Sequence, residues 1–279
     1  MENESKQSLQ QITLELGCTL DELTGRVSPH QLLGVLAVTD VAVLLEAKSS
    51  NQQVILKMPR QTELARSEDA IGKIRFEADW LRRCAGVPNV VNLIEFRDDD
   101  LLPFLVLDRL GMTVGAATPA TGLALRETII LVLDLVRALR EIDVRGEQHN
   151  DIRRWNVLRG PDGWTLIDPS ETTITGAPEE IDCCPDVEIV GIARLALSLH
   201  MGLEDDCCQE EEFECPSSVL ELAPGIGRLF DRMLGNLGAA HVPSPDEVYD
   251  LMDRYLATMD LATTASEVSQ NADNGSPRV

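Results

Sequence analysis

The chain has 279 residues, of which 44% are hydrophobic and 25% are charged, a balance typical of a globular protein rather than of a disordered chain. Its formal net charge is −23, from 47 acidic and 24 basic residues. Such a surface repels nucleic-acid phosphates and anionic membranes, so we expect neither as a partner, whereas basic peptides remain compatible.

The N-terminal sequence MENESKQSLQQITLEL has neither the basic stretch nor the apolar run of a secretory signal. The longest apolar run, residues 128–133, is too short to span a bilayer. The seven cysteines are an odd number and include two adjacent pairs, Cys183–Cys184 and Cys207–Cys208, which is a poor disulfide framework. CxxC spacing is absent, so we expect ordinary thiols rather than a zinc site, in an intracellular protein of the cytoplasm or nucleus.

The first part of the chain is rich in predicted strands. Residues 1–10 are polar and are predicted to be disordered. The elements predicted after them are strands within 33–57, a helix over 62–84, and strands at 90–96 and 103–110. This pattern predicts a small N-lobe, residues 11–110, made mostly of strands with one main helix.

After Gly111 the pattern becomes helical. The predicted elements are a helix over 125–142, strands at 156–160 and 164–168 joined by a Pro-Asp-Gly turn, and helices from 186 to about 201, over 225–237 and over 245–257. We therefore expect a C-lobe at 111–258 and a disordered tail at 259–279. Strands first and helices second predict an α+β fold with two unequal lobes.

Three polar residues flank the predicted hairpin of the C-lobe. Asp151 and Asn156 lie five residues apart, and Asp168 follows the second strand of the hairpin. These side chains can converge on one point, and Asn and Asp oxygens suit Mg²⁺ together with substrate phosphates. Asp151 is then placed to accept a proton from an incoming hydroxyl. Either residue alone would more simply cap a turn.

At these residues the sequence resembles the protein kinase superfamily. HNDIRRWNVL, residues 149–158, resembles the kinase catalytic loop H-R-D-x-x-x-x-N, and WTLIDPS resembles the strand that ends in D-F-G. The motif D-I-R-x-x-N-V-L also resembles the corresponding motif of divergent fungal and oomycete kinase-like domains, including those of crinkler-type effectors. The resemblance covers about residues 30–257 and implies a two-lobed kinase-like fold that uses ATP and Mg²⁺.

The resemblance also implies a role for each matched residue. Lys57 would bind the α- and β-phosphates and pair with Glu77, while Asn156 and Asp168 would hold Mg²⁺. Asp151 would position the acceptor hydroxyl, and Arg153 would contact the transferring phosphate. The residues implied to contact the rest of the nucleotide are Gly34 and Val41 in the phosphate-covering loop, the gatekeeper Leu107, and Asp108 to Leu110 along the adenine edge.

The resemblance assigns structural roles as well. Asp186 would anchor the backbone of the catalytic loop, and His149 would brace that loop. We expect Trp155 and Trp164 to pack around the hairpin rather than to act as stacking surfaces.

The sequence departs from the kinase pattern in several places. The phosphate-covering loop keeps only the first of its glycines, with Leu36 and Thr39 at the other two positions. Asn150 replaces the arginine that receives a phosphorylated activation loop in many kinases. Pro169 and Ser170 replace Phe and Gly after Asp168. The segment up to Asp186 is short, with Ala177-Pro178-Glu179 inside it, and an acidic stretch follows at 204–214.

These observations leave three functions open. The first is an atypical protein kinase that transfers the γ-phosphate of ATP to a serine or threonine hydroxyl of a protein substrate, including a basic one. The second is a pseudokinase scaffold that binds partners, with or without nucleotide, and has no turnover. The third is a small-molecule phosphotransferase of the aminoglycoside or choline type, although the longer helical insertions usual in those enzymes are missing. Nothing in the sequence indicates the oligomeric state.

Overall fold

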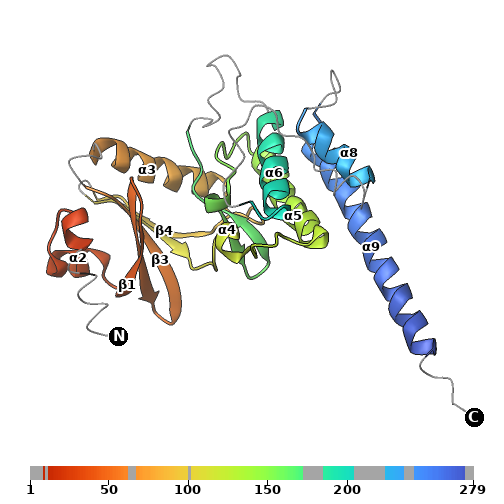
Figure 1. The fold of residues 1–279 in the computed structure, drawn as a ribbon. Coiled ribbons are helices and arrows are strands. Elements are labelled where there is room, and N and C mark those ends of the chain that lie inside the picture. The colour runs from red at the N-terminus through yellow and green to blue at the C-terminus, as the bar shows by residue number, and fades with distance from the viewer. Residues whose placement is uncertain are drawn as a thin grey trace, which may run out of the picture. The chain divides into compact units, whose positions relative to one another are not determined.

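The computed structural model describes residue 9 and residues 12–61, 67–99, 102–171, 185–203, 224–235 and 242–273, with side chains left out at 67–68, 185–187, 224 and 262–273. The chain forms two compact units, Met1–Gly111 and Met112–Val279 (Figure 1). No helix of the described part combines the length and apolar character that a bilayer crossing requires.

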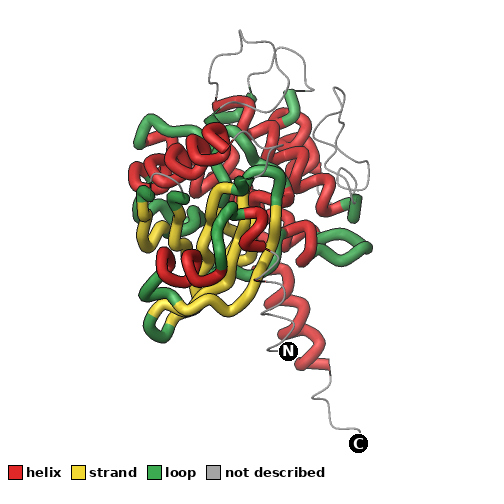
Figure 2. The backbone as a smooth tube through the Cα atoms, turned by 90° about the vertical axis from the view of Figure 1, so that its left-hand side faces the viewer, coloured by secondary structure: helices red, strands yellow, loops and turns green. Residues whose placement is uncertain are grey.

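The first unit is built on a five-stranded antiparallel sheet with the order β1-β2-β3-β5-β4, drawn in yellow in Figure 2. Its elements are α2 (Leu20–Val27), β1 (Gln31–Val38), β2 (Ala42–Ser49), β3 (Gln52–Pro59), α3 (Ser67–Arg83), β4 (Leu93–Arg97) and β5 (Phe104–Asp108). The single main helix of the predicted N-lobe corresponds to α3.

The central strand β3 is buried on both faces. Val54, Leu56 and Met58 belong to a core that also contains apolar residues of α2. Because successive side chains of a strand point to opposite faces, Ile55 and Lys57 lie on the other face, and both are also buried. This explains why the sequence of β3 is almost continuously apolar instead of alternating.

Residues ahead of β1 complete the sheet's core. Helix α2 begins with a capping box, in which Thr19 and Glu22 each bond the other's backbone N–H. Leu9, which lies in the segment predicted to be disordered, is 7% exposed and belongs to the same core. The segment before β1 therefore contributes apolar packing to the sheet, a role that its polar composition does not suggest.

The second unit is mostly helical, as predicted. Its elements are α4 (Val114–Ala117), α5 (Leu125–Val144), the 3-10 turn η1 (Arg154–Asn156), β6 (Val157–Gly160), β7 (Gly163–Leu166), α6 (Pro185–His200), α8 (Pro224–Met233) and α9 (Pro245–Asp273). Helix α5 contacts both α6 and α9. The sheet with one main helix, followed by a helical part, confirms the predicted α+β class.

Helix α9 extends into the segment that was predicted to be a disordered tail from residue 259. Its backbone is helical to Asp273. Residues 259–273 contain Ala, Leu, Met and Glu and no Pro or Gly, so their intrinsic helix propensity is compatible with continuation of the helix. The polar composition that predicted disorder did not distinguish this segment from a helix.

Candidate functional site

Lys57 and Glu77 form a buried ion pair within the first unit. The Lys57 Nζ lies 2.6 Å from Glu77 Oε2, and the two residues are 6% and 3% exposed. Strand β3 supplies the lysine and α3 supplies the glutamate. Removing charges from water is costly, so a pair at this depth needs close contact to persist. The structure brings together the two residues that the sequence predicted to pair.

The sheet register identifies the neighbours of Lys57. Leu44 on β2 and Leu105 on β5 lie directly across from it, and Leu107 lies across from Ile55. Leu107, the predicted gatekeeper, is therefore on the face that carries Lys57. Val41 precedes β2, with its carbonyl accepting a hydrogen bond from Arg60 N. The β2 residue opposite Lys57 is therefore Leu44. The glycine-loop motif pointed to Val41 instead and did not identify Leu44.

An ion pair crosses the sheet near the predicted adenine edge. Arg109, which follows β5, donates two hydrogen bonds to Glu46 Oε1, at 3.1 Å from Nε and 2.6 Å from Nη2. The carboxylate of the preceding Asp108 accepts from Gln52 Nε2 at 3.0 Å. Leu110 completes the predicted edge and is half-buried. Sequence reasoning did not find Glu46, because its partner is 63 residues away in the chain.

The turn between β1 and β2 is closed by a side chain rather than by glycine. Thr39 Oγ1 accepts from Ala42 N at 2.9 Å and donates to Ala42 O at 3.1 Å. Gly34 lies within β1, opposite Glu46, and a Cβ added there would meet nothing within 4 Å. Leu36, at the position of a missing glycine, is 51% exposed. Where the kinase motif has glycines, the β1–β2 hairpin therefore has the exposed side chain of Leu36 and the turn-closing side chain of Thr39.

Two residues of the second unit have left-handed backbone conformations. Asn150 has φ 62° and Asp168 has φ 60°. Asn and Asp adopt this conformation more readily than other non-glycine residues. The Asn150 side chain also donates to Ser170 O at 3.3 Å. Asn150 and Asp168 are thus residue types that tolerate the left-handed conformation. This conformation occurs where the loop at 149–156 meets the segment after β7.

Asp151, Asn156 and Arg153 are joined directly. The Asn156 amide donates to Asp151 O at 3.0 Å and to Asp151 Oδ2 at 2.7 Å. Arg153 Nε donates to the other carboxylate oxygen, Oδ1. These bonds fix the orientation of the Asp151 carboxylate. They also leave Asn156 Oδ1 as an acceptor, which is the atom that a metal would require.

The charge state of Asp151 is set by opposing effects. Burial raises the pKa of this carboxyl, and the nearby charge of Asp168 raises it further, while Arg153 and the Asn156 hydrogen bond lower it. A raised pKa makes the carboxylate a stronger base for a hydroxyl proton. The influence of Asp168 on Asp151 also shows that the two predicted carboxylates lie in one neighbourhood.

His149 braces the loop, as predicted. It is fully buried, its Nδ1 accepts from Asp151 N at 3.3 Å, and its Nε2 donates to Ile167 O at 2.9 Å. Burial lowers the pKa of His149 to about 4, so the ring is neutral at physiological pH. A neutral ring with both nitrogens engaged is a structural residue rather than a base.

Glu188 anchors the backbone at the start of the loop that carries Asp151. Its Oε1 accepts from His149 N at 2.6 Å and from Asn150 N at 2.9 Å. Burial raises the pKa of Glu188, although these two hydrogen bonds lower it. The side chain of Asp186 lies outside the described residues. The anchoring role of Asp186 therefore stays a prediction, and Glu188, two residues further along α6, is an acceptor that the motif did not identify.

Trp155 does not pack around the hairpin. Its side chain is 59% exposed, whereas Trp164 is 3% exposed and packs as predicted. The neighbouring Arg154 is buried instead, because it donates to Leu203 O at 2.7 Å and its methylenes lie against Gly115. Hydropathy alone would have assigned the opposite burial to Arg154 and Trp155.

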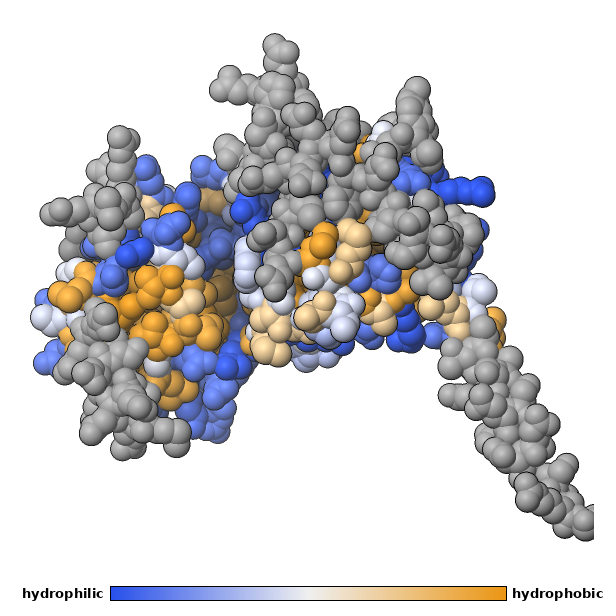
Figure 3. Space-filling view, viewed as in Figure 1, coloured by the Kyte–Doolittle hydropathy of each residue, from blue (hydrophilic) through white to orange (hydrophobic). Residues whose placement is uncertain are grey.

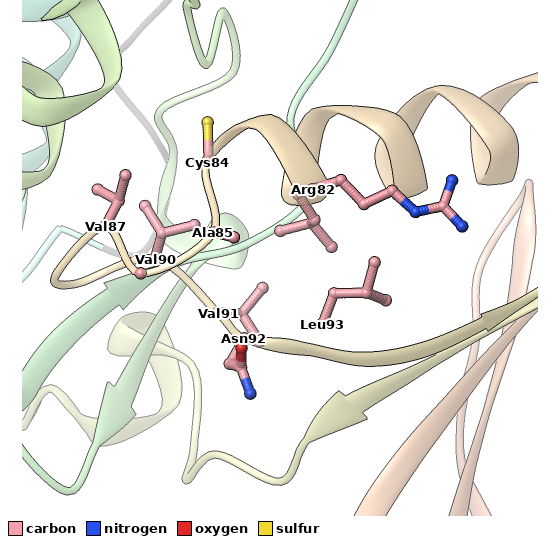
Figure 4. A pocket seen from close by; sticks show the side chains of 10 residues that line it. Arg82, Cys84, Ala85, Val87, Val90, Val91, Asn92 and Leu93 are labelled. Atoms are coloured by element: carbon pink, nitrogen blue, oxygen red, sulfur yellow. The ribbon is translucent and has the colours of Figure 1, made fainter. Parts of the chain in front are cut away.

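A cavity of about 380 Å³ lies elsewhere in the first unit. It is lined by residues from the end of α3 to the start of β4 (Figure 4): Leu81, Arg82, Cys84, Ala85, Gly86, Val87, Val90, Val91, Asn92 and Leu93. None of these is a predicted nucleotide residue, so the cavity's position does not coincide with the predicted chemistry. Apolar side chains also gather over the strands of this unit (Figure 3).

The residues present suit Mg²⁺ as part of a nucleotide complex. Within the described ranges, no group of three or more His, Cys, Asp or Glu side chains has the arrangement of a metal site. Asn156 and Asp168 would supply two oxygen ligands, and Mg²⁺ commonly takes only one or two protein ligands beside phosphates and water. The donor set therefore fits a substrate-dependent metal better than a resident one.

Several predicted features lie outside the described residues. These are Ala177-Pro178-Glu179, the acidic stretch 204–214, and the paired cysteines Cys183–Cys184 and Cys207–Cys208.

Comparison with known proteins supports the fold. No protein-family model matches the sequence. The crystal structure of the PknI kinase domain of Mycobacterium tuberculosis is similar to this chain, with a TM-score of 0.63, 17% identity, and coverage of 83% of this chain and 96% of that one. A cysteine-to-alanine variant of the same domain gives a TM-score of 0.62 at 16% identity, covering 81% and 95%. The chain therefore has a two-lobed protein-kinase-like fold.

Proposed function

We propose that this chain is an atypical protein kinase that transfers the γ-phosphate of ATP to a serine or threonine hydroxyl. The Asp151–Asn156 pair is the observation that carries the proposal. Its hydrogen bonds of 2.7 and 3.0 Å orient a partly buried carboxylate and leave an amide oxygen for a cation. A scaffold without turnover has no need of this orientation.

The remaining residues supply what phosphoryl transfer requires. Lys57, held by Glu77, would bind the α- and β-phosphates, and Asn156 with Asp168 would hold Mg²⁺. Bound Mg²⁺ would offset the negative charge of the phosphates. Catalysis of this reaction depends mainly on positioning and charge stabilisation, which explains how so few polar groups suffice.

In the proposed transfer, the acceptor hydroxyl oxygen forms a bond to the γ-phosphorus, and the bond from that phosphorus to the bridging oxygen breaks. Its electron pair goes to ADP, and the hydroxyl proton passes to Asp151. The raised pKa of the buried Asp151 favours its accepting this proton. Arg153, whose guanidinium is bound to Asp151, would offset the developing charge.

A pseudokinase is the second candidate, and the β1–β2 turn favours it. Thr39 closes that turn in place of glycine, and Leu36 is exposed beside it. Side chains at these positions keep backbone N–H groups from approaching a phosphate as closely as glycine allows. On this reading the polar residues are retained for structure or nucleotide binding alone.

Transfer of labelled γ-phosphate separates the two candidates. We expect the wild-type protein to label itself or a mixed serine- and threonine-containing peptide pool when Mg²⁺ is present. Asp168→Ala and Asp151→Asn should each lose at least 100-fold in rate, consistent with the usual contribution of general base and electrostatic groups. Val144→Ala serves as the control, because Val144 is an exposed residue of the second unit and takes no part in the proposed chemistry. Equal labelling by wild type and Asp168→Ala would contradict the kinase assignment.

A further inference from the structure

Trp155 is a large apolar side chain exposed beside the residues assigned to chemistry. It is the central residue of η1, between Arg154 and Asn156, and both of its neighbours are buried. Asn156 bonds to Asp151, and Arg154 bonds to Leu203 O. The backbone on each side of Trp155 is therefore fixed, and the exposed indole is held in place rather than left on a freely moving loop.

The indole is available to an external partner. Four other aromatic rings, Phe96, Phe104, Trp164 and Tyr249, have an arginine guanidinium over them at 4.7 to 5.8 Å. Within the described part of the chain no arginine covers Trp155 in this way. Tryptophan provides the strongest cation–π surface of the aromatic side chains. Trp155 can therefore offer to a ligand the contact that the other rings make internally.

Charge indicates which ligand fits. The chain has a formal net charge of −23, and its field attracts cations and repels anions. Asp151, four residues before Trp155, adds a carboxylate on the same loop. The negative field and the indole face both favour binding of a cationic side chain. A neutral or anionic side chain would bind more weakly.

We propose that Trp155 binds an arginine or lysine side chain of a peptide acceptor by a cation–π contact, and so selects basic substrates. This inference rests on the proposed function for its identification of the ligand as an acceptor. Trp155 follows Asp151 by only four residues, and an extended peptide advances about 3.3 Å per residue, so the cation should lie within a few residues of the phosphorylated hydroxyl. The net charge alone suggested a basic protein substrate. Trp155 would provide the specific contact that recognises it.

The test uses matched peptides that differ only in charge. A set of serine peptides carries a single arginine at each position from three before to three after the serine, and a second set carries citrulline, which is similar in shape but uncharged. Trp80 and Trp164 are 1% and 3% exposed, so quenching of tryptophan fluorescence by acrylamide reports mainly on Trp155. Peptide protection from quenching therefore measures binding at this residue without any turnover.

We expect at least one arginine peptide to bind about threefold to tenfold more tightly than its citrulline counterpart, the range for a cation–π contact. Trp155→Ala should abolish that preference, and Trp155→Phe should keep part of it. Val144→Ala is the control, since Val144 is another exposed apolar residue of this unit and should leave the preference unchanged. The ratio of kcat/KM for the two peptides should follow the same order wherever transfer is measurable.

The outcomes separate this inference from the proposed function. Transfer to serine with equal use of arginine and citrulline peptides, in wild type and Trp155→Ala alike, would overturn the inference and leave the kinase assignment standing. Arginine-selective protection of Trp155 with no transfer would support the basic contact and count against the kinase. Equal protection by arginine, citrulline and norleucine peptides would show an apolar contact and overturn the inference.

Discussion

Glu188 on α6 accepts a hydrogen bond of 2.6 Å from the backbone N–H of His149, 39 residues earlier in the chain. The same oxygen accepts from Asn150 N at 2.9 Å. A helix of the second unit thus fixes the start of the loop that carries Asp151. The geometry of the proposed catalytic base depends on a carboxylate that takes no part in the chemistry.

Replacing Glu188 tests this dependence. Glu188→Ala leaves one buried and one partly buried N–H group without an acceptor, each of which costs about 1–3 kcal/mol, so we expect a loss of about 2–6 kcal/mol in the free energy of unfolding. Glu188→Gln keeps a neutral acceptor and should lose less. Urea denaturation measures both. Asp186→Ala is the comparison, and a larger loss there than in Glu188→Ala would return the anchoring role to Asp186.

The neutral state of His149 predicts a pH dependence of stability. Its pKa in the folded protein is about 4, below the ordinary value of 6.5, so the unfolded chain binds more protons between these values. The contribution of His149 to stability is therefore full above pH 6.5 and is lost as the pH falls towards 4. Between pH 7 and pH 5 the loss should be about 2 kcal/mol.

Urea denaturation of wild type and His149→Gln at pH 5, 6 and 7 isolates this contribution. The variant should be less stable at pH 7 but should show a shallower decline towards pH 5. Val144→Ala, at an exposed position of the same unit without a titratable group, should keep the wild-type decline. Parallel pH profiles for wild type and His149→Gln would contradict a buried neutral ring.

Gly163, at the β6–β7 turn, is predicted to resist substitution. Its φ is +135°, and a Cβ there would lie 2.4 Å from Asp134 Oδ2, the atom that accepts from Trp164 N. Gly163→Ala should therefore cost about 3 kcal/mol through backbone strain and displacement of Asp134. Gly34→Ala should change stability by less than about 0.5 kcal/mol, because nothing lies within 4 Å of a Cβ at that position. Thermal or urea unfolding of the two variants makes the comparison, and equal losses would show that the turn can rearrange.

The order of strands and helices was predictable because the signals are local. Continuous apolar runs marked β3 and β5, and one-sided apolar periodicity marked α5. The order of the kinase motifs predicted that Lys57 pairs with Glu77, and the structure contains this ion pair. The sheet register places Leu107 on the face that carries Lys57, and its role as gatekeeper stays a prediction.

The features that the sequence did not reveal depend on long-range contacts. Glu188 is two residues after the acidic residue that fits the motif, and its contact with His149 N depends on how α6 packs against a loop 39 residues earlier in the chain. The exposure of Trp155 follows from Arg154, whose burial requires Leu203 O, 49 residues away. The apolar packing of Leu9 depends in the same way on the sheet core, since the segment around it is polar in composition.

We propose that Lys57 and Asp168 contact the same bound Mg·ATP, and a binding titration tests this proposal most directly. Calorimetric titration and thermal-shift measurement with ATP, with and without Mg²⁺, would be made on wild type, Lys57→Met, Asp168→Asn and the double variant. Melting of each protein without ligand shows whether the variants are folded. We predict Mg²⁺-dependent binding by wild type, with stabilisation of about 2.7 kcal/mol at ATP concentrations 100 times the Kd. Lys57→Met should weaken binding at least 10-fold, and Asp168→Asn should remove the dependence on Mg²⁺. Binding that is unaffected by either substitution, or no binding by a folded wild-type protein, would contradict the account.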